Sequence, residues 1–87
     1  MFWNAPLSYV VTPKSGPVRP MRTLEDARSA LIHDLPPGAS KRPHWMQAGF
    51  RLVTASESGL PDDIHAAAEA LVAALEAEGW MTRSQKK

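Results

Sequence analysis

The chain has 87 residues, of which 44% are hydrophobic, a net charge of +1 and no cysteine. This length leaves room for one domain with one hydrophobic core. The absence of cysteine excludes a disulfide scaffold, thiol catalysis and cysteine-based zinc or iron–sulfur sites. No apolar run is long enough to cross a membrane and the first residues lack a secretory signal pattern, so we expect a cytoplasmic protein without a membrane partner.

Charge is distributed unevenly along the chain. Residues 1–43 carry six basic and three acidic side chains, whereas residues 44–82 carry one basic and six acidic ones. The first segment therefore has a charge of +3 and the second a charge of −5, and the last five residues add +3. Segments of opposite charge can attract each other within one fold or between two copies of it.

The first quarter of the chain has the pattern of a β-hairpin. Residues 7–12 alternate loosely and are rich in β-forming side chains, which indicates a strand. Gly16 lies in a turn sequence, and residues 17–22 are expected to continue in extended conformation. Because Pro17 and Pro20 lack a backbone N–H, this second strand can pair on one side only and is predicted to be an edge.

Residues 24–34 have the apolar spacing of a short amphipathic helix. Thr23 is a candidate N-cap, and the two acidic residues in the first turn lie where the helix dipole favours negative charge. Pro36 disfavours the helical conformation at Leu35, so the helix is expected to end there.

A second helix is predicted to begin after Ser40, its candidate cap, with Pro43 in its first turn, and to end before Gly59. One face is apolar through Trp45, Ala48, Leu52 and Ala55, and beside it lies a second apolar stripe of Met46, Phe50 and Val53. A helix that is apolar over so much of its circumference is expected to be central and to pack on two sides. Only a narrow polar strip is then left as a surface that can act on something, and it consists of His44, Gln47 and Arg51.

Residues 61–78 predict a third helix, whose apolar seam consists of Ile64, Ala68, Leu71 and Leu75. Gly79 fits the left-handed position after a helix, and Trp80 is then expected to fold back and be largely buried. In an alternative, residues 80–82 form a short third strand beside the hairpin. The predicted fold is thus α+β, with an N-terminal two-stranded antiparallel hairpin followed by three helices. It forms a single domain of residues 1–82 with a flexible basic tail of residues 83–87.

The order of these segments resembles a family called domain of unknown function 982, whose members are short, mostly alphaproteobacterial proteins. The resemblance is carried by "TLEDARSAL", a Leu-Pro break, "AGFRLVTA", a Gly-Leu-Pro turn and "AEALVAALEAEGW". The chain departs from the family pattern at three positions: Leu35 stands in place of a Trp, Leu52 in place of a Cys and Ala68 in place of an Arg. The resemblance implies the same small fold and a bacterial cytoplasm, and it implies no activity.

Few residues are candidates for catalysis or metal binding. His65 and Glu69 are four residues apart with Asp62 one turn earlier, but a bound zinc normally needs three or four ligands, so an ordinary helix surface is favoured. Ser40 and His44 could be combined with an acid on paper, yet no serine lies in the strained turn of a known nucleophile. We therefore predict no enzyme activity, no metal and no cofactor.

Two functions remain open. The first is a non-catalytic protein-interaction or regulatory module that binds a second copy of itself or another protein, which the unpaired hairpin edges and the alanine-rich third helix suggest. The second is RNA or DNA binding through a basic patch, for which the candidates are Lys14, Arg19, Arg22, Lys41, Arg42 and Arg51. The isoelectric point of 8.2 is low for this second function, and the third helix has five acids and no Lys or Arg, so it is not suited to enter a groove.

Overall fold

The structure is a computed structural model, and it describes residues 1–81. Its elements are β1 (Pro6–Val11), β2 (Met21–Thr23), α1 (Leu24–Ser29), a π-helical continuation of α1 (Ala30–Asp34), a 3-10 turn (Ala39–Lys41), α2 (Pro43–Ser58) and α3 (Pro61–Glu78). The predicted α+β fold, an antiparallel hairpin followed by three helices, is confirmed. Residues 80 and 81 do not form a strand. Thr82 and the predicted tail of residues 83–87 lie outside the described residues.

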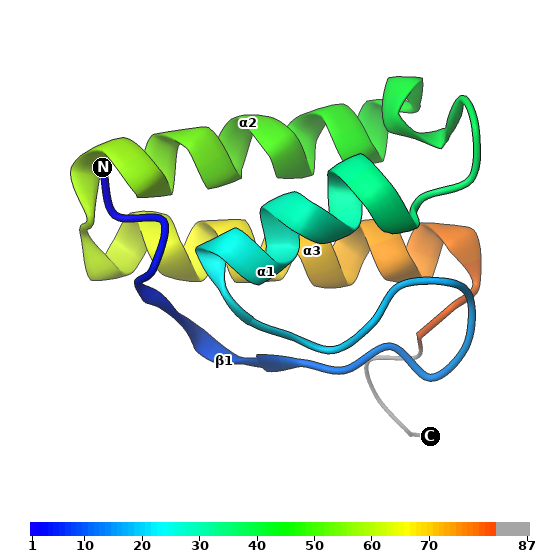
Figure 1. Ribbon diagram of the computed structural model, residues 1–87, viewed down its shortest axis with the longest axis horizontal. Helices are drawn as coiled ribbons and strands as arrows, with labels where there is room; N and C mark the ends of the chain where they lie inside the picture. The colour runs from blue at the N-terminus through cyan, green and yellow to red at the C-terminus, as the bar shows by residue number, and fades with distance from the viewer. Residues whose placement is uncertain (82–87) are drawn as a thin grey trace.

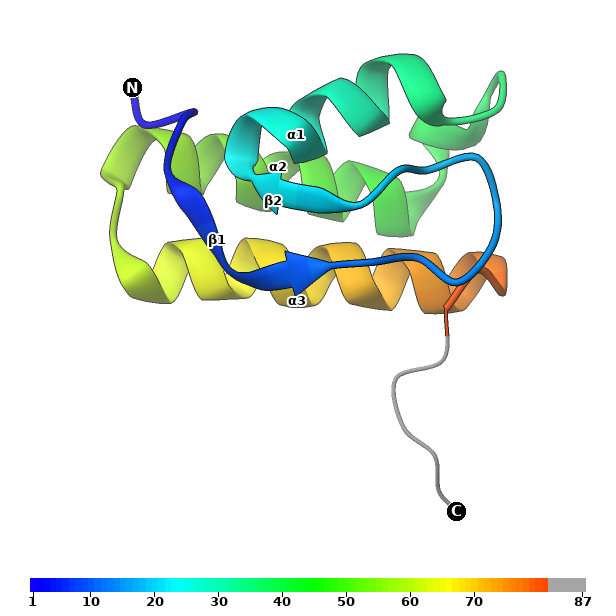
Figure 2. The ribbon, with the colours of Figure 1, turned by 60° about the horizontal axis from the view of Figure 1, so that its bottom comes forward.

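Helices α2 and α3 lie side by side in opposite directions and form the framework of the molecule (Figure 1). The turn between them is short because Gly59 adopts the left-handed conformation, with a φ of 67°. β1 lies across α3, while β2 leads directly into α1, which packs on α2 (Figure 2). The hydrophobic core lies between these elements, and Trp45 is its largest fully buried side chain.

The hairpin is shorter and less regular than predicted. β2 contains only three residues and begins directly after Pro20. Its pairing with β1 places Pro6 opposite Thr23 and Val11 opposite Met21, so the register is irregular between these two points. The two prolines expected to limit the second strand instead keep residues 17–20 out of it, because neither can donate a ladder hydrogen bond.

One of the two predicted helix caps is present. Thr23 forms a capping box with Asp26: its hydroxyl accepts from the Asp26 N–H at 3.1 Å, and the Asp26 carboxylate accepts from the Thr23 N–H. The prediction that Ser40 caps the second helix is wrong. Ser40 lies in the 3-10 turn, and the N-cap of α2 is Arg42, which makes no side-chain cap bond. The physical reason is Pro43, which forces the residue before it into an extended conformation.

Of the two apolar stripes of α2 that were expected to be buried, one is buried and the other is exposed. The face of Trp45, Ala48, Leu52 and Ala55 is buried, as expected, but Met46, Phe50 and Val53 are exposed by 61%, 63% and 45%. The prediction that both apolar stripes of α2 are packed is therefore wrong for the second stripe. Among residues 1–81, α2 packs mainly against α3 and α1, and Leu31, in the π-helical continuation of α1, reaches it at Gly49. The hairpin does not cover the exposed side of α2, because it packs on α3.

The loop of the hairpin packs against the C-terminal end of α3. Gly79 is left-handed with a φ of 79°, as predicted, and the Trp80 N–H donates to the Leu75 carbonyl at 2.9 Å. Trp80 itself is half-buried, less than expected. The backbone N–H groups of Lys14 and Ser15 donate to its carbonyl at 2.8 and 3.1 Å, and Gly16 lies against its ring.

This close approach makes Gly16 sensitive to substitution. A Cβ at Gly16 would lie 2.5 Å from Trp80 Cδ2, and the φ of Gly16 is +82°. Gly38 is a matched control, because its φ is +83° but a Cβ there would have no neighbour within 4 Å. We predict that Gly38→Ala costs about 1 kcal/mol for the positive φ alone. Gly16→Ala should cost about 1–3 kcal/mol more than that, since a side chain must move. Urea unfolding of the two variants measures the difference, and equal losses would contradict the packing of Gly16 on Trp80.

Candidate functional site

A cluster of polar side chains connects the start of α2 to the end of α3. At its centre is the carboxylate of Glu78, whose side chain is 8% exposed. It accepts a hydrogen bond from Trp45 Nε1 at 2.8 Å and another from His44 Nε2 at 2.9 Å. The guanidinium of Arg42 donates to both of its oxygens. These four residues are called the Glu78 cluster below.

The Glu78 carboxylate stays ionised over the physiological pH range. Hydrogen bonds from His44 and Arg42 lower the pKa of Glu78 to about 2, and they outweigh its partial burial, which acts in the opposite direction. A carboxylate with this pKa neither donates nor takes up a proton near neutral pH, so it is unsuited to general acid–base chemistry. The cluster therefore has the properties of a structural ion pair.

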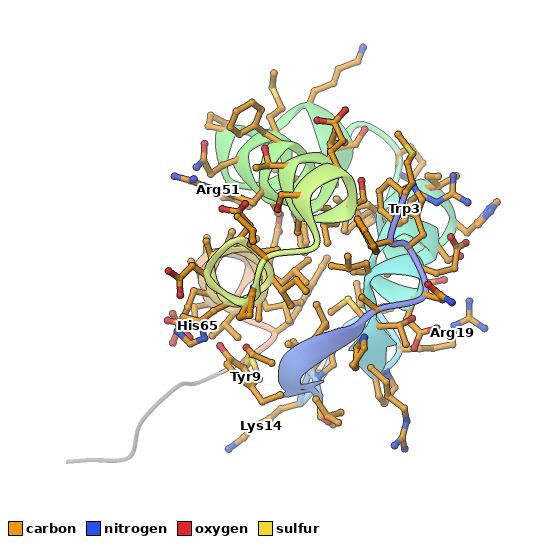
Figure 3. All side chains as sticks on the ribbon, turned by 90° about the vertical axis from the view of Figure 1, so that its left-hand side faces the viewer. Trp3, Tyr9, Lys14, Arg19, Arg51 and His65 are labelled. Atoms are coloured by element: carbon orange, nitrogen blue, oxygen red, sulfur yellow. The ribbon has the colours of Figure 1, made fainter. Side chains whose placement is uncertain are left out.

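A second group of polar side chains fastens β1 to α3. Ser8 Oγ and His65 Nδ1 share a hydrogen bond at 3.2 Å, and the Tyr9 hydroxyl donates to the Glu69 carboxylate. The rings of Tyr9 and His65 meet edge to face, 6.1 Å apart (Figure 3). His65 and Glu69, the two residues weighed as metal ligands, are thus both engaged by the strand. Within residues 1–81, no group of three or more histidine and acidic side chains is placed to hold a metal ion.

The six basic residues of the nucleic-acid hypothesis fall into two groups. Arg19 and Arg42 are paired with acids of the same chain, Asp34 at 3.2 Å and Glu78. The other four are exposed and make no ion pair with residues 1–81, and they are Lys14, Arg22, Lys41 and Arg51. Figure 3 shows Lys14, Arg19 and Arg51 pointing away from three different sides of the molecule. The structure thus does not gather these three side chains on one face.

The polar strip predicted on α2 is divided in the structure. His44 is half-buried and bonds to Glu78, whereas Gln47 and Arg51 are exposed. Because the Nε2 atom of His44 is bound to a carboxylate and not to Ser40, it is not placed to activate a serine.

A pocket of about 270 Å³ lies between the residues directly before β2 and the helical segment of α1 and its π-helical continuation. Its lining residues are Arg19, Pro20, Asp26, Ser29 and Asp34. The charged groups in it are already satisfied, because Asp34 accepts from Arg19 and Asp26 accepts from two backbone N–H groups. The pocket has therefore no unpaired group that would recognise a ligand.

The feature that the sequence reasoning missed is the exposed side of α2. Met46, Phe50 and Val53 are spaced by four and three residues, so they line one side of the helix, and we call them the α2 stripe. Among residues 1–81, the other exposed large apolar side chains lie near the N-terminus, on β1, on the π-helical continuation of α1 and after Gly59, and are Met1, Phe2, Tyr9, Val10, Ile32 and Leu60. In the α2 stripe, three such side chains lie next to one another along one side of a single helix.

Comparison of the chain with protein-family models, curated proteins and solved structures finds no match. The resemblance to the domain of unknown function 982 family therefore stays a prediction. No helix among residues 1–81 has the length and apolar character needed to cross a bilayer.

The Glu78 cluster predicts a specific dependence of stability on pH. We expect Glu78→Gln to lower the free energy of unfolding at pH 7 by about 1–3 kcal/mol, since it removes the charge that Arg42 and His44 bind. Because the pKa of Glu78 is lower in the folded protein than its ordinary value of 4.5, the stabilisation is fully present above about pH 4.5. It is lost as the pH falls toward 2, where wild type and variant should converge.

Thermal unfolding of both proteins between pH 7 and pH 2 measures this effect. Glu25→Gln is the control, because Glu25 pairs with Arg28 on the exposed surface of α1, where water and salt screen an ion pair and its contribution to stability is small. A difference between wild type and Glu78→Gln that stays constant over this pH range would contradict the assigned role of Glu78.

Proposed function

We propose that this protein is a non-catalytic protein-interaction module and that the α2 stripe is its contact surface. The observation that carries the proposal is the exposure of Met46, Phe50 and Val53 in register on one helix. Exposed apolar side chains in one contiguous patch reduce solubility, and they are typical of sites that bind another protein. Phenylalanine and methionine are also enriched where proteins contact each other, and methionine adapts its shape to a partner.

The rest of the molecule supports a binding role better than a catalytic one. The two polar clusters use their histidines and acids to join secondary-structure elements, and the pocket beside α1 has its charges paired. The α2 stripe, in contrast, makes no visible contribution to the core, whose members on α2 lie on the Trp45 face. Apolar side chains that do not stabilise the fold, and whose exposure to water is unfavourable, are best explained by a partner protein that buries them. In line with the resemblance and the lack of cysteine, we place this module in the bacterial cytoplasm.

Nucleic-acid binding has weaker support as an alternative. It requires several cations on one face, and two of the six candidates are neutralised by acids of the same chain. The four others come from the hairpin loop, from β2, from the turn before α2 and from the middle of α2.

The proposal can be tested with a photo-reactive amino acid incorporated at position 50 in cells of the native organism. We expect position 50 to form covalent adducts with a protein, because the Phe50 side chain would be covered when the partner is bound. Gln47 is the matched control position, since it is also exposed on α2 but outside the stripe. Adduct masses on a denaturing gel, followed by peptide mass spectrometry, give the result. If position 50 gives no more adduct than position 47, the α2 stripe is not a contact surface.

Retention on an immobilised polyanion tests the nucleic-acid alternative. We expect the wild-type protein to pass through a heparin or RNA column at about 50 mM salt, because its unpaired cations are dispersed. A Lys14→Gln, Lys41→Gln double variant is the comparison. Retention of the wild type that falls with salt, with a shallower slope in the double variant, would favour nucleic-acid binding instead.

A further inference from the structure

Each end of the α2 stripe carries an exposed charge of opposite sign. Glu57 continues the stripe at its C-terminal end, because positions 46, 50, 53 and 57 follow the spacing of one helix side. Lys41 lies at the other end, in the 3-10 turn directly before α2. Both side chains are exposed, and neither makes an ion pair with any residue between 1 and 81. The surface is therefore positive at one end, apolar in the middle and negative at the other end.

Such a surface is complementary to a copy of itself that runs in the opposite direction. Resting on the proposed function, we infer that the partner of the α2 stripe is a second copy of this chain, packed with its α2 antiparallel across a two-fold axis near Phe50. Met46 precedes Phe50 by four residues and Val53 follows it by three. In this arrangement Phe50 therefore meets the partner copy's Phe50, and each Met46 meets a Val53.

The charges select the antiparallel direction. With the axis near Phe50, Glu57 of one copy lies beside Lys41 and the α2 N-terminus of the other, and the same contact occurs twice. The positive end of the helix dipole adds to the attraction by Lys41. A parallel pair would instead place the two Glu57 carboxylates together and the two Lys41 ammonium groups together, which is unfavourable.

The other surfaces proposed from the sequence for self-association are less available. Ser8 and Tyr9 of β1 are bonded to α3, and three of the seven α3 alanines, Ala67, Ala68 and Ala74, belong to the core. The charge contrast between the two halves of the chain is partly satisfied within one copy, since Arg42 of the first half pairs with Glu78 of the second.

The size of the contact sets its strength. A standard interface buries about 800 Å² on each partner. That area is roughly a sixth of the 5006 Å² of accessible surface of this chain, and it is more than three side chains can supply. We therefore expect a reversible dimer with a dissociation constant in the micromolar range.

Sedimentation equilibrium of the purified protein from low micromolar to near-millimolar concentration tests the inference. Phe50→Ser should raise the dissociation constant at least about tenfold, while Gln47→Ser should leave it unchanged. Glu57→Lys and Lys41→Glu should each raise it by about 3- to 10-fold at low salt, because each creates two like-charge contacts. The Glu57→Lys, Lys41→Glu double variant should return to near the wild-type value. Circular dichroism confirms that each variant is folded.

Two results would overturn the inference. A wild-type protein that stays at the monomer mass of 9.5 kDa over the whole range would exclude the dimer. If position 50 then still cross-links to a different protein in cells, the proposed interaction function stands and only the identity of the partner is wrong. A double charge variant that dimerises no better than the single variants would exclude the antiparallel arrangement.

Discussion

The hydrogen bond from the Trp45 indole to the Glu78 carboxylate is the interaction on which the arrangement of this small protein depends. Trp45 is 1% exposed, and a buried indole N–H needs an acceptor. Glu78 provides it, and its own charge is tolerated at 8% exposure because Arg42 and His44 donate to it. One carboxylate at the end of α3 thereby fixes both the register and the rotation of α2.

Two consequences follow from this fixed rotation. At the end of α3, Gly79 turns the chain so that Trp80 lies against Trp45, with ring centres 6.2 Å apart, and the hairpin loop is held there through Gly16. On α2, the side chain that follows Trp45 points about 100° further around the helix, as 3.6 residues per turn require. Met46 therefore faces away from α3, and Phe50 and Val53 face the same way. The exposure of the α2 stripe is thus built into the packing that holds the two helices together.

Sequence reasoning was most successful where a single residue decides the local backbone. Thr23 caps α1 through its hydroxyl, and Pro43 begins α2. Gly59 and Gly79 end α2 and α3, because glycine, which has no Cβ, adopts the left-handed conformation without strain. The C-terminal ends of both long helices and the start of α3 were therefore predictable. The assignment of Ser40 as a cap is wrong because Pro43 holds Arg42 in an extended conformation, so that α2 begins only at Pro43.

Contacts between distant residues could not be predicted in the same way. Periodicity showed that α2 has two apolar stripes, but it could not show which of them would be covered. That choice depends on where the hairpin packs, and the hairpin packs on α3. The pairing of Arg42 and His44 with Glu78 links residues more than thirty positions apart, and nothing in the local sequence indicates it. One signal was present: a domain with only one short helix besides α2 and α3 has little material to cover α2 all round.

The absence of cysteine makes a direct measurement of the proposed α2 pairing practical, because a single introduced cysteine can carry a spin label without background. Arg51 and Ser58 are exposed positions of α2 outside the stripe. In an antiparallel pair centred near Phe50, the separation between equivalent labels grows by about 3 Å along the axis for each residue away from the centre, twice the helical rise. Dipolar electron resonance should therefore give a short distance for labels at position 51 and a distance about 20 Å longer along the helix axis for labels at position 58. No dipolar signal at a concentration well above micromolar, or equal distances at the two positions, would contradict the account.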